Sequence, residues 1–204
     1  MGDDVRGDEE MGRSVHVGEL RRYARSTAAF SARDVELLAD DRGYALLMLH
    51  NLAARGELNR ITRGWYSIHR DPVVSVFAMR PAYVGLQEAL SLRNLWEQET
   101  NVVIVTCGKA KPGVRKVMGE SVIVHRIAPQ YFFGFDYLPY GEFYVPVSDP
   151  EKTLLDLVYF GEDPGKDVLR DVARGADAKV MTRYLRRYPS AFATRVKRAL
   201  RFDS

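Results

Sequence analysis

The sequence of 204 residues contains a single cysteine, Cys107, and no long apolar run. One thiol cannot close a disulfide within the chain, which excludes a disulfide-stapled secreted scaffold and agrees with a reducing compartment. The longest uninterrupted apolar stretch, Tyr44 to Leu49, is far shorter than the roughly 20 residues of a membrane-spanning helix. The N-terminus is acidic, where a signal peptide is basic and then apolar. We therefore expect a cytoplasmic protein with no membrane segment.

Motifs for metal or nucleotide binding are also scarce. The four histidines are scattered and Cys107 has no second cysteine, so the ligand spacing of a zinc site is missing. Gly108 and Gly113 have the spacing of a phosphate loop, but Val114 and Arg115 stand where that loop needs Lys and Ser or Thr. We interpret this segment as a solvated basic loop and expect neither a metal nor a cofactor.

What the sequence does have is an uneven distribution of charge behind its net charge of +3. The net charge is −4 over residues 1–10, +4 over 13–80, −4 over 81–165 and +7 over 166–204. Two basic blocks around an acidic centre are typical of a protein that meets a phosphate-rich partner at two places. Residues 1–13 have almost no apolar periodicity, and we expect them to form a disordered acidic tail.

Apolar periodicity predicts three helices in the N-terminal part of the chain. The first covers about 16–28. The second follows Ser31, which is placed to cap it with Asp34 three residues later. The third covers 44–55, and Gly56 stands where a left-handed residue ends a helix.

A hairpin is predicted directly after these helices. Leu58–Ile61 and Trp65–Ile68 are short β-favouring runs on either side of a Thr-Arg-Gly turn. Three helices followed by a hairpin with a basic tip are the layout of a winged helix-turn-helix, so we expect a DNA-binding domain over residues 14–80.

This layout also predicts which side chains meet DNA. Asn and Arg make bidentate contacts with adenine and guanine in the major groove, and cations on a hairpin suit phosphates. The third helix is unusually apolar, since it carries Leu46 and Leu47 besides its buried stripe, and an extra face of it can contact the second domain or a partner. The predicted DNA-binding residues are Arg42 just before the helix, Tyr44, His50, Asn51 and Arg55 on the helix, and Arg60, Thr62 and Arg63 on the hairpin.

Residues 81–204 are expected to form a mixed α/β domain that ends in basic helices, which makes the whole chain α+β. Val73 to Met79 could be a strand or a connector into it. Strands are predicted at 101–106, 121–126 and 143–147. Helices are predicted at 83–96, at 150–160 with Ser148 or Asp149 as cap, and near 166–174, 178–188 and 190–202.

Three carboxylates near one helix start, Asp149, Glu151 and Asp156, could hold a metal ion, as nucleases do. Capping explains the first two, and Lys152 can pair with Asp156 four residues on. We favour this structural interpretation, so we do not expect an enzyme. The alternative is a metal-dependent nuclease or nucleotidyl-transferring enzyme that uses the three acids.

Two other stretches carry candidate surfaces. Residues 131–144 hold eight aromatic residues without a cation, which favours a core or a protein-facing surface over a base-stacking platform. The last helices carry more cations than the helix dipole needs, which indicates a second surface for phosphate or for an acidic protein. Its residues are Arg183, Arg186, Arg187, Arg195, Lys197, Arg198 and Arg201.

Over roughly residues 15–160 the sequence resembles the AbiEi-type antitoxins, the antitoxin and transcriptional-regulator half of type IV toxin–antitoxin systems of abortive infection. The order of the motifs carries the resemblance more than any one of them. The motifs are Leu52-Ala-Ala-Arg-Gly-Glu-Leu58, Ile61-Thr-Arg-Gly-Trp-Tyr66, Tyr83-Val-Gly-Leu-Gln-Glu-Ala-Leu90, Val102-Val-Ile-Val-Thr106, His125-Arg-Ile-Ala-Pro, Phe132-Phe-Gly134 and Val147-Ser-Asp-Pro-Glu-Lys-Thr-Leu-Leu-Asp156.

The resemblance implies a winged-helix domain that binds double-stranded DNA at the protein's own promoter and represses its operon. It also implies a second domain that counters a nucleotidyltransferase-like toxin encoded beside it, without requiring a stable complex. A third hypothesis remains open, in which the apolar third helix and the aromatic stretch dock a protein.

Overall fold

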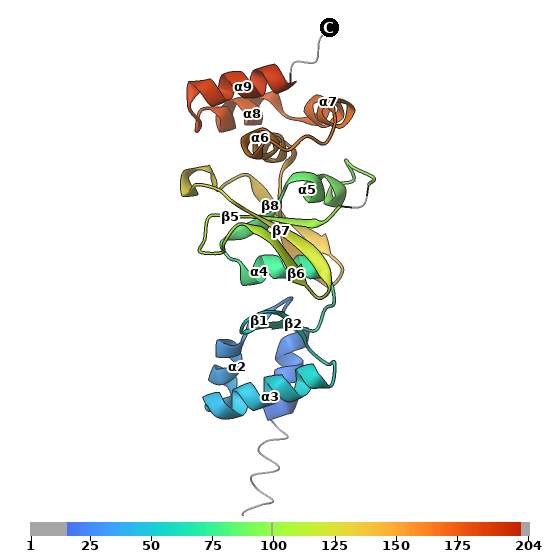
Figure 1. The fold of residues 1–204 in the computed structure, drawn as a ribbon, viewed down its shortest axis with the longest axis vertical. Coiled ribbons are helices and arrows are strands. Elements are labelled where there is room, and N and C mark those ends of the chain that lie inside the picture. Colours follow the sequence, from blue (N-terminus) through green and yellow to red (C-terminus); the bar gives the residue numbers. More distant parts are fainter. Residues whose placement is uncertain (1–15, 99, 201–204) are drawn as a thin grey trace, which may run out of the picture. The chain divides into compact units, whose positions relative to one another are not determined.

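The computed structural model describes residues 16–98 and 100–200. The tail expected over residues 1–13 and Arg201 lie outside the described residues. The chain divides between Ala78 and Met79 into two compact units, here called the N-terminal and the C-terminal unit (Figure 1). The fold is α+β, because helices accompany a small three-stranded sheet and a mixed six-stranded sheet.

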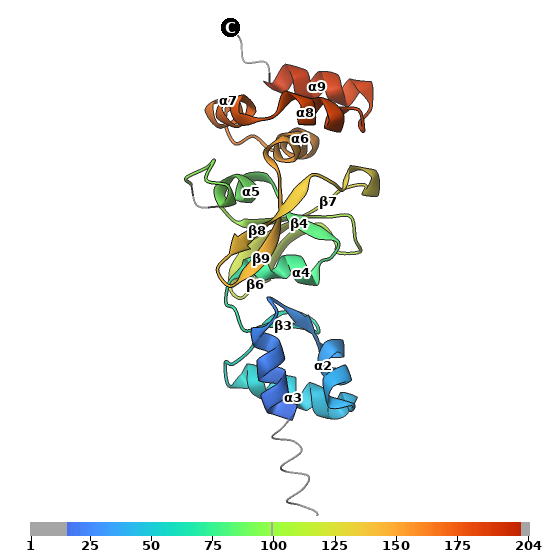
Figure 2. The ribbon, with the colours of Figure 1, turned by 180° about the vertical axis from the view of Figure 1, so that it is seen from behind.

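The N-terminal unit places its first three helices on one side of a small sheet, as both views of the ribbon show (Figures 1 and 2). The sheet has the order β1-β3-β2, and both pairings are antiparallel. The elements are a helix over residues 16–25, β1 (Phe30–Ser31), α2 (Ala32–Ala39), α3 (Arg42–Ala54), β2 (Asn59–Thr62), β3 (Trp65–Ser67), the 3-10 turn η1 (Pro72–Val74) and α4 (Ser75–Ala78).

Side chains before α2 and α3 fix where these helices begin. Ser31 and Asp34 form the expected capping box, in which the Ser31 side chain accepts from the Asp34 backbone N–H and the Asp34 carboxylate accepts from that of Ser31. Asp41 caps α3 by accepting from the Tyr44 backbone N–H at 2.7 Å. The stripe predicted for the third helix is confirmed, since the side chains that α3 buries are Ala45, Met48, Leu49 and Leu52.

The predicted hairpin is confirmed as β2 and β3. Its register shifts between Arg60 and Thr62, and Gly64 in the turn has a φ of +73°. A glycine suits this left-handed conformation because it has no Cβ. The short strand β1 was not predicted: it extends the sheet by pairing Phe30 with Tyr66.

The C-terminal unit is built on a mixed sheet with the strand order β6-β7-β5-β4-β9-β8. Neighbouring pairs alternate, since β5–β7 and β4–β9 are parallel and the other three pairs are antiparallel. The strands are β4 (Ala82–Val84), β5 (Val102–Thr106), β6 (Gly113–Val117), β7 (Glu120–Arg126), β8 (Phe135–Tyr140) and β9 (Phe143–Ser148).

Five helices lie on one face of this sheet (Figures 1 and 2). They are α5 (Leu86–Leu92), α6 (Pro150–Phe160), α7 (Lys166–Gly175), α8 (Ala178–Leu185) and α9 (Ser190–Leu200), and the 3-10 turn η2 (Pro129–Tyr131) precedes β8. α6 lies between the sheet and the last three helices, so it is almost enclosed: every residue from Glu151 to Leu157 is buried. Leu154 belongs to a buried apolar cluster with residues of α5 and β5. Leu155 belongs to another such cluster, with Tyr188 and Val196.

Several boundaries differ from those expected. The helix predicted from Tyr83 is wrong at its start, because Tyr83 and Val84 belong to β4 and the helix begins at Leu86. β4 has three residues, which are too few for the alternating pattern of a strand to be recognised in the sequence. Gly85 makes the junction possible, because a Cβ there would lie 2.8 Å from Val105 Cγ2. Over 73–79, where a strand or a connector is expected, the strand is wrong because the segment is mainly helical.

Candidate functional site

The exposed face of α3 consists of two rows of residues at four-residue steps. One row is Arg42, Leu46, His50 and Ala54, and the other is Gly43, Leu47, Asn51 and Arg55, with all eight exposed. Residues four apart lie one above the other on a helix, so the rows run side by side along α3. The rows contain no carboxylate. We call these eight residues the α3 face.

Four of the five predicted helix residues lie on the α3 face, namely Arg42, His50, Asn51 and Arg55. Tyr44 does not. Its side chain is half-buried against the apolar core, and its ring lies edge-on to that of His16, with 6.0 Å between the ring centroids. Tyr44 therefore contributes to the packing of α3 against the first helix.

The hairpin presents its predicted residues at and beside the turn. Arg60, Thr62 and Arg63 are all exposed. The Arg60 Nε lies 3.4 Å from the Thr62 carbonyl oxygen, to which it donates, so this guanidinium is directed along the hairpin. Ala32 of α2 donates its backbone N–H to the Gly64 carbonyl oxygen at 2.8 Å, which fixes the turn relative to the helices. Arg63 therefore stands on a braced turn.

In the structure, the cations that are predicted to form one basic surface of the C-terminal unit lie in separate places. Arg183 and Arg186 line a shallow hollow of about 400 Å³ on α8 together with Lys179 and Thr182. Two of the other cations make contacts within the fold. The Arg187 guanidinium lies 4.0 Å from the centroid of the Phe133 ring, and Arg195 donates to the Val158 carbonyl oxygen at 3.1 Å.

The remaining described cations of that set, Lys197 and Arg198, are exposed on the last turn of α9. Within the described part of the chain, the surface therefore has two patches with different helices behind them. The hollow on α8 is the one where cations converge.

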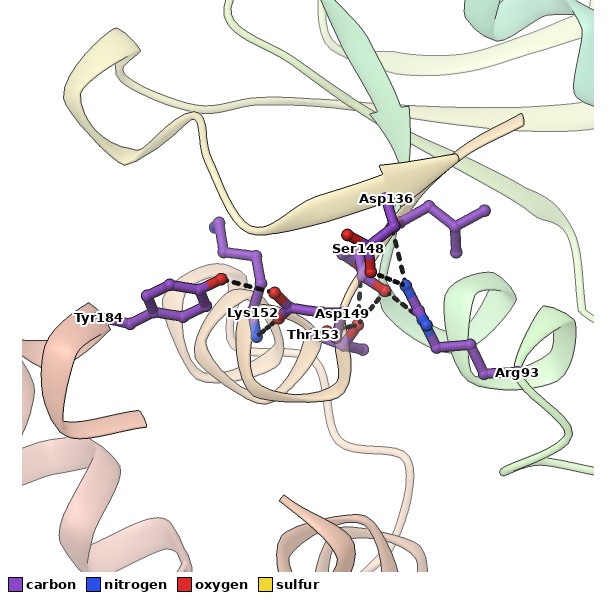
Figure 3. A network of polar contacts seen from close by, with 8 residues as sticks. Arg93, Asp136, Ser148, Asp149, Lys152, Thr153 and Tyr184 are labelled. Atoms are coloured by element: carbon purple, nitrogen blue, oxygen red, sulfur yellow. Dashed lines mark hydrogen bonds and ion pairs between the residues drawn. The ribbon is translucent and has the colours of Figure 1, made fainter. Parts of the chain in front are cut away.

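A network of polar contacts surrounds the start of α6, where the sequence reads Ser148-Asp-Pro-Glu-Lys-Thr (Figure 3). Asp149 caps the helix by accepting from the Lys152 backbone N–H at 2.7 Å, and its second oxygen accepts from the Tyr184 hydroxyl at 2.6 Å. Arg93 donates to the Ser148 carbonyl oxygen at 2.7 Å. Hence this short segment joins α6 to α5 and α8.

The electrostatics of this cap follow from its burial. Partial burial raises the pKa of the Asp149 carboxyl, while the hydrogen bonds from Tyr184 and from the Lys152 backbone oppose that rise. Burial and the bond to Asp149 together raise the pKa of Tyr184 to about 12. The tyrosine thus stays protonated at physiological pH and serves as a hydrogen-bond donor to the carboxylate.

One turn further along α6 lies a fully buried ion pair. Lys152 Nζ donates to Asp156 Oδ1, and both side chains have an exposed fraction of 0%. The Tyr83 hydroxyl donates to Asp156 Oδ2 at 2.6 Å, and Lys152 Nζ also lies 3.3 Å from the Tyr188 hydroxyl oxygen. Burial raises the pKa of Asp156 and lowers that of Lys152, while their mutual attraction opposes both shifts. The predicted pairing four residues apart is confirmed.

Each of the three acids of the enzyme alternative has partners within the fold. Asp149 caps α6, Asp156 pairs with Lys152, and Glu151 accepts from the Asp177 backbone N–H at 2.5 Å, where α8 begins. Among residues 16–98 and 100–200, no three His, Cys, Asp or Glu side chains gather as a metal site would need. Asp149 and Glu151 thus connect α6 with α8, and Asp156 connects α6 with β4.

Sequence reasoning missed Tyr83, Arg93, Tyr184 and Tyr188 as members of this network. Each comes from an element other than α6, and Tyr83 and Asp156 are 73 residues apart. Helical spacing finds only partners on the same helix, so it identified Lys152 and Asp156 alone. The aromatic stretch over 131–144 indicates a core or a protein-facing surface, but it does not identify the polar residues that this core encloses.

Comparisons with known proteins bear on the fold. No model of a protein family matches the chain, and no curated protein matches it. The chain is similar to the crystal structure of the RV2827C protein from Mycobacterium tuberculosis, with a TM-score of 0.59 at 15% identity, over 93% of this chain and 76% of that one. At this identity the similarity concerns the fold. In the part of the chain that the structure covers, no helix is both long and apolar enough to cross a membrane.

Proposed function

We propose that the protein is a non-enzymatic DNA-binding transcriptional regulator of the antitoxin type, whose N-terminal unit acts as a winged helix-turn-helix. α3 would lie in the major groove and the β2–β3 hairpin would lie beside it as the wing. The α3 face carries the proposal: it presents two arginines, a histidine and an asparagine without a carboxylate among them. Such a face suits a polyanion with hydrogen-bonding groups between its phosphates.

The hairpin supports the same assignment. Thr62 and Arg63 are exposed at a turn that α2 holds in place through a backbone hydrogen bond. A cation on a braced turn can contact phosphate without reorganising the chain. Phosphate contacts position a module on DNA, whereas contacts with base edges specify the sequence.

The antitoxin part of the proposal rests on the resemblance to AbiEi-type proteins. It assigns to the C-terminal unit the task of countering a nucleotidyltransferase-like toxin encoded next to this gene. Co-expression of the full chain with the product of the adjacent gene tests it: growth should be restored. Growth arrest that persists despite expression of a folded chain would contradict it.

A pair of substitutions separates the two kinds of DNA contact. Arg63→Ala should weaken binding to the DNA upstream of the gene and to random duplex about equally, and should reduce the salt slope by about 1. Asn51→Ala should instead reduce the difference in affinity between the upstream DNA and random duplex. Arg174→Ala is the matched control, because it removes an exposed arginine of α7 outside both predicted surfaces. If Asn51→Ala and Arg63→Ala had the same effect on both DNAs, α3 would not be recognising bases.

A further inference from the structure

The centre of the α3 face is apolar, although it is open to solvent. The exposed fraction is 48% for Leu46 and 55% for Leu47. They are consecutive residues, about 100° apart around the helix axis, and each takes the second position of one of the two rows. Together they are called the leucine patch. The buried stripe of α3 is already complete without them. Besides these leucines, the α3 face has the small residues Gly43 and Ala54 and four polar side chains, which makes it a candidate contact surface.

Charge and size around the two leucines restrict what can cover them. Arg42 stands at the first residue of α3 and Arg55 just beyond its last, about 20 Å apart along the axis at 1.5 Å per residue. Between them, Gly43 and Ala54 add little bulk, so a partner can approach the helix closely.

Carboxylates flank both ends of α3. Asp40 and Asp41 precede Arg42, and Asp41 accepts from the Tyr44 backbone N–H. Glu57 lies near Arg55 and forms an ion pair with Arg21. The polar side chains of the α3 face itself, two arginines, a histidine and an asparagine, all carry hydrogen-bond donors, so the occupant offers acceptors or negative charge beside an apolar group.

Duplex DNA has this pattern in its major groove. The groove is about 12 Å wide and is bordered by phosphates, and the thymine 5-methyl is the apolar group on its base edges. A helix that extends beyond this width can place its ends near the phosphates and its middle over the bases. Asn51 lies one turn beyond Leu47 in the same row, within reach of a neighbouring base pair. Asparagine is suited to adenine, the partner of thymine.

We propose that Leu46 and Leu47 contact thymine 5-methyl groups in the major groove, so that the protein recognises thymine-containing sites through apolar contacts beside the Asn51 contact. This proposal rests on the proposed function, since it requires α3 to lie in the groove. It accounts for the apolar character of α3, because removing leucine and methyl surface from water favours binding. The same contacts discriminate against cytosine, which lacks the methyl group.

The test uses the full chain and two versions of the duplex from upstream of its gene. In one version deoxyuridine replaces thymidine, which removes the methyl groups and keeps base pairing. Affinity should fall about fourfold for each contacted methyl group, so about tenfold or more for two. Leu46→Ala and Leu47→Ala should each reduce this difference between the two duplexes. Leu37→Ala is the matched control, because Leu37 is 77% exposed on the neighbouring α2 and lies off the α3 face.

The outcomes separate this proposal from the proposed function. If the chain prefers its upstream DNA and binds the thymine and uracil versions equally, the methyl contact is refuted and DNA recognition stands. If it shows no preference for that DNA, both are refuted. Sedimentation of the same variants detects the remaining occupant: a dimer that Leu47→Ala dissociates, together with equal binding to both duplexes, would assign the patch to a second copy of the chain. Circular dichroism confirms that each variant is folded.

Discussion

Replacing Lys152 with methionine tests the buried ion pair of α6. Methionine is similar in length to the lysine stem and can retain its apolar packing, but it removes the ammonium group that Asp156 faces. Asp156 would then be left in a fully buried position, where the Tyr83 hydroxyl still donates to its Oδ2. A buried charge that loses its partner typically costs about 3–5 kcal/mol. That is a large part of the 5–15 kcal/mol that stabilises a typical domain.

The pH dependence of this loss has a definite sign. Burial already raises the pKa of Asp156 in the wild type, and removal of Lys152 should raise it further. A carboxyl whose pKa is higher in the folded than in the unfolded state binds protons preferentially when folded, so the variant should regain stability as the pH falls below its folded pKa, until the unfolded pKa is reached. The recovery is limited to about 1.4 kcal/mol per pH unit for one group.

The assay exploits the two tryptophans of the chain, Trp65 in the N-terminal unit and Trp96 in the C-terminal unit. In a Trp65→Phe background, the fluorescence of Trp96 reports unfolding of the C-terminal unit alone during a urea titration. Lys152→Met/Asp156→Asn is the matched control, since asparagine can still accept from the Tyr83 hydroxyl without a charge, and it should recover much of the loss. If Lys152→Met lowered the free energy of unfolding by less than about 1 kcal/mol, or if that loss were independent of pH, the buried Lys152–Asp156 pair would not have this role.

Two further substitutions test local structure. Ser31→Ala removes half of the capping box with Asp34 and should lower the free energy of unfolding of the N-terminal unit by about 1 kcal/mol, as read from Trp65 fluorescence in a Trp96→Phe background. A loss below about 0.3 kcal/mol would contradict this role. Gly134→Ala should destabilise the C-terminal unit by about 1–3 kcal/mol more than Gly141→Ala, because both glycines have positive φ but only at Gly134 would a Cβ meet another side chain, 2.9 Å from Lys152 Cβ. Equal losses in a urea titration would show that this close contact is unimportant.

The parts of the fold that sequence alone predicted are those with a local cause. The α3 stripe follows from helical periodicity, the start of α2 from Ser31 and Asp34, and β5 from its Val-Val-Ile-Val core. Each of these depends on residues close together in the chain.

The parts that were missed depend on distant partners. β4 is three residues long and is a strand because β5 and β9 flank it. β6 and β8 are edge strands whose pattern of buried residues is irregular. Similarly, the contact of Tyr184 with Asp149 joins residues 35 apart in the sequence. No periodicity within one element encodes such a contact.

The candidate DNA surface includes residues of both kinds, those placed by a local cause and those placed by a distant partner. Exposure of Arg42, His50, Asn51 and Arg55 follows from the period of α3, so these residues could be placed on its open face from sequence. Tyr44 is predicted on the same surface because it lies off the buried stripe, and in the structure its ring packs beside His16 of the first helix. The packing of α3 against the first helix therefore determines where the Tyr44 side chain lies.

The most direct test of DNA recognition by α3 is the affinity of the full chain for the duplex upstream of its gene, compared with random duplex by fluorescence anisotropy over a range of salt concentrations. Both affinities should fall steeply as salt rises, because phosphate contacts release counterions. The preference for the upstream duplex should persist across the range, since contacts with base edges depend less on salt. Equal affinity for the two duplexes at every salt concentration would contradict the account.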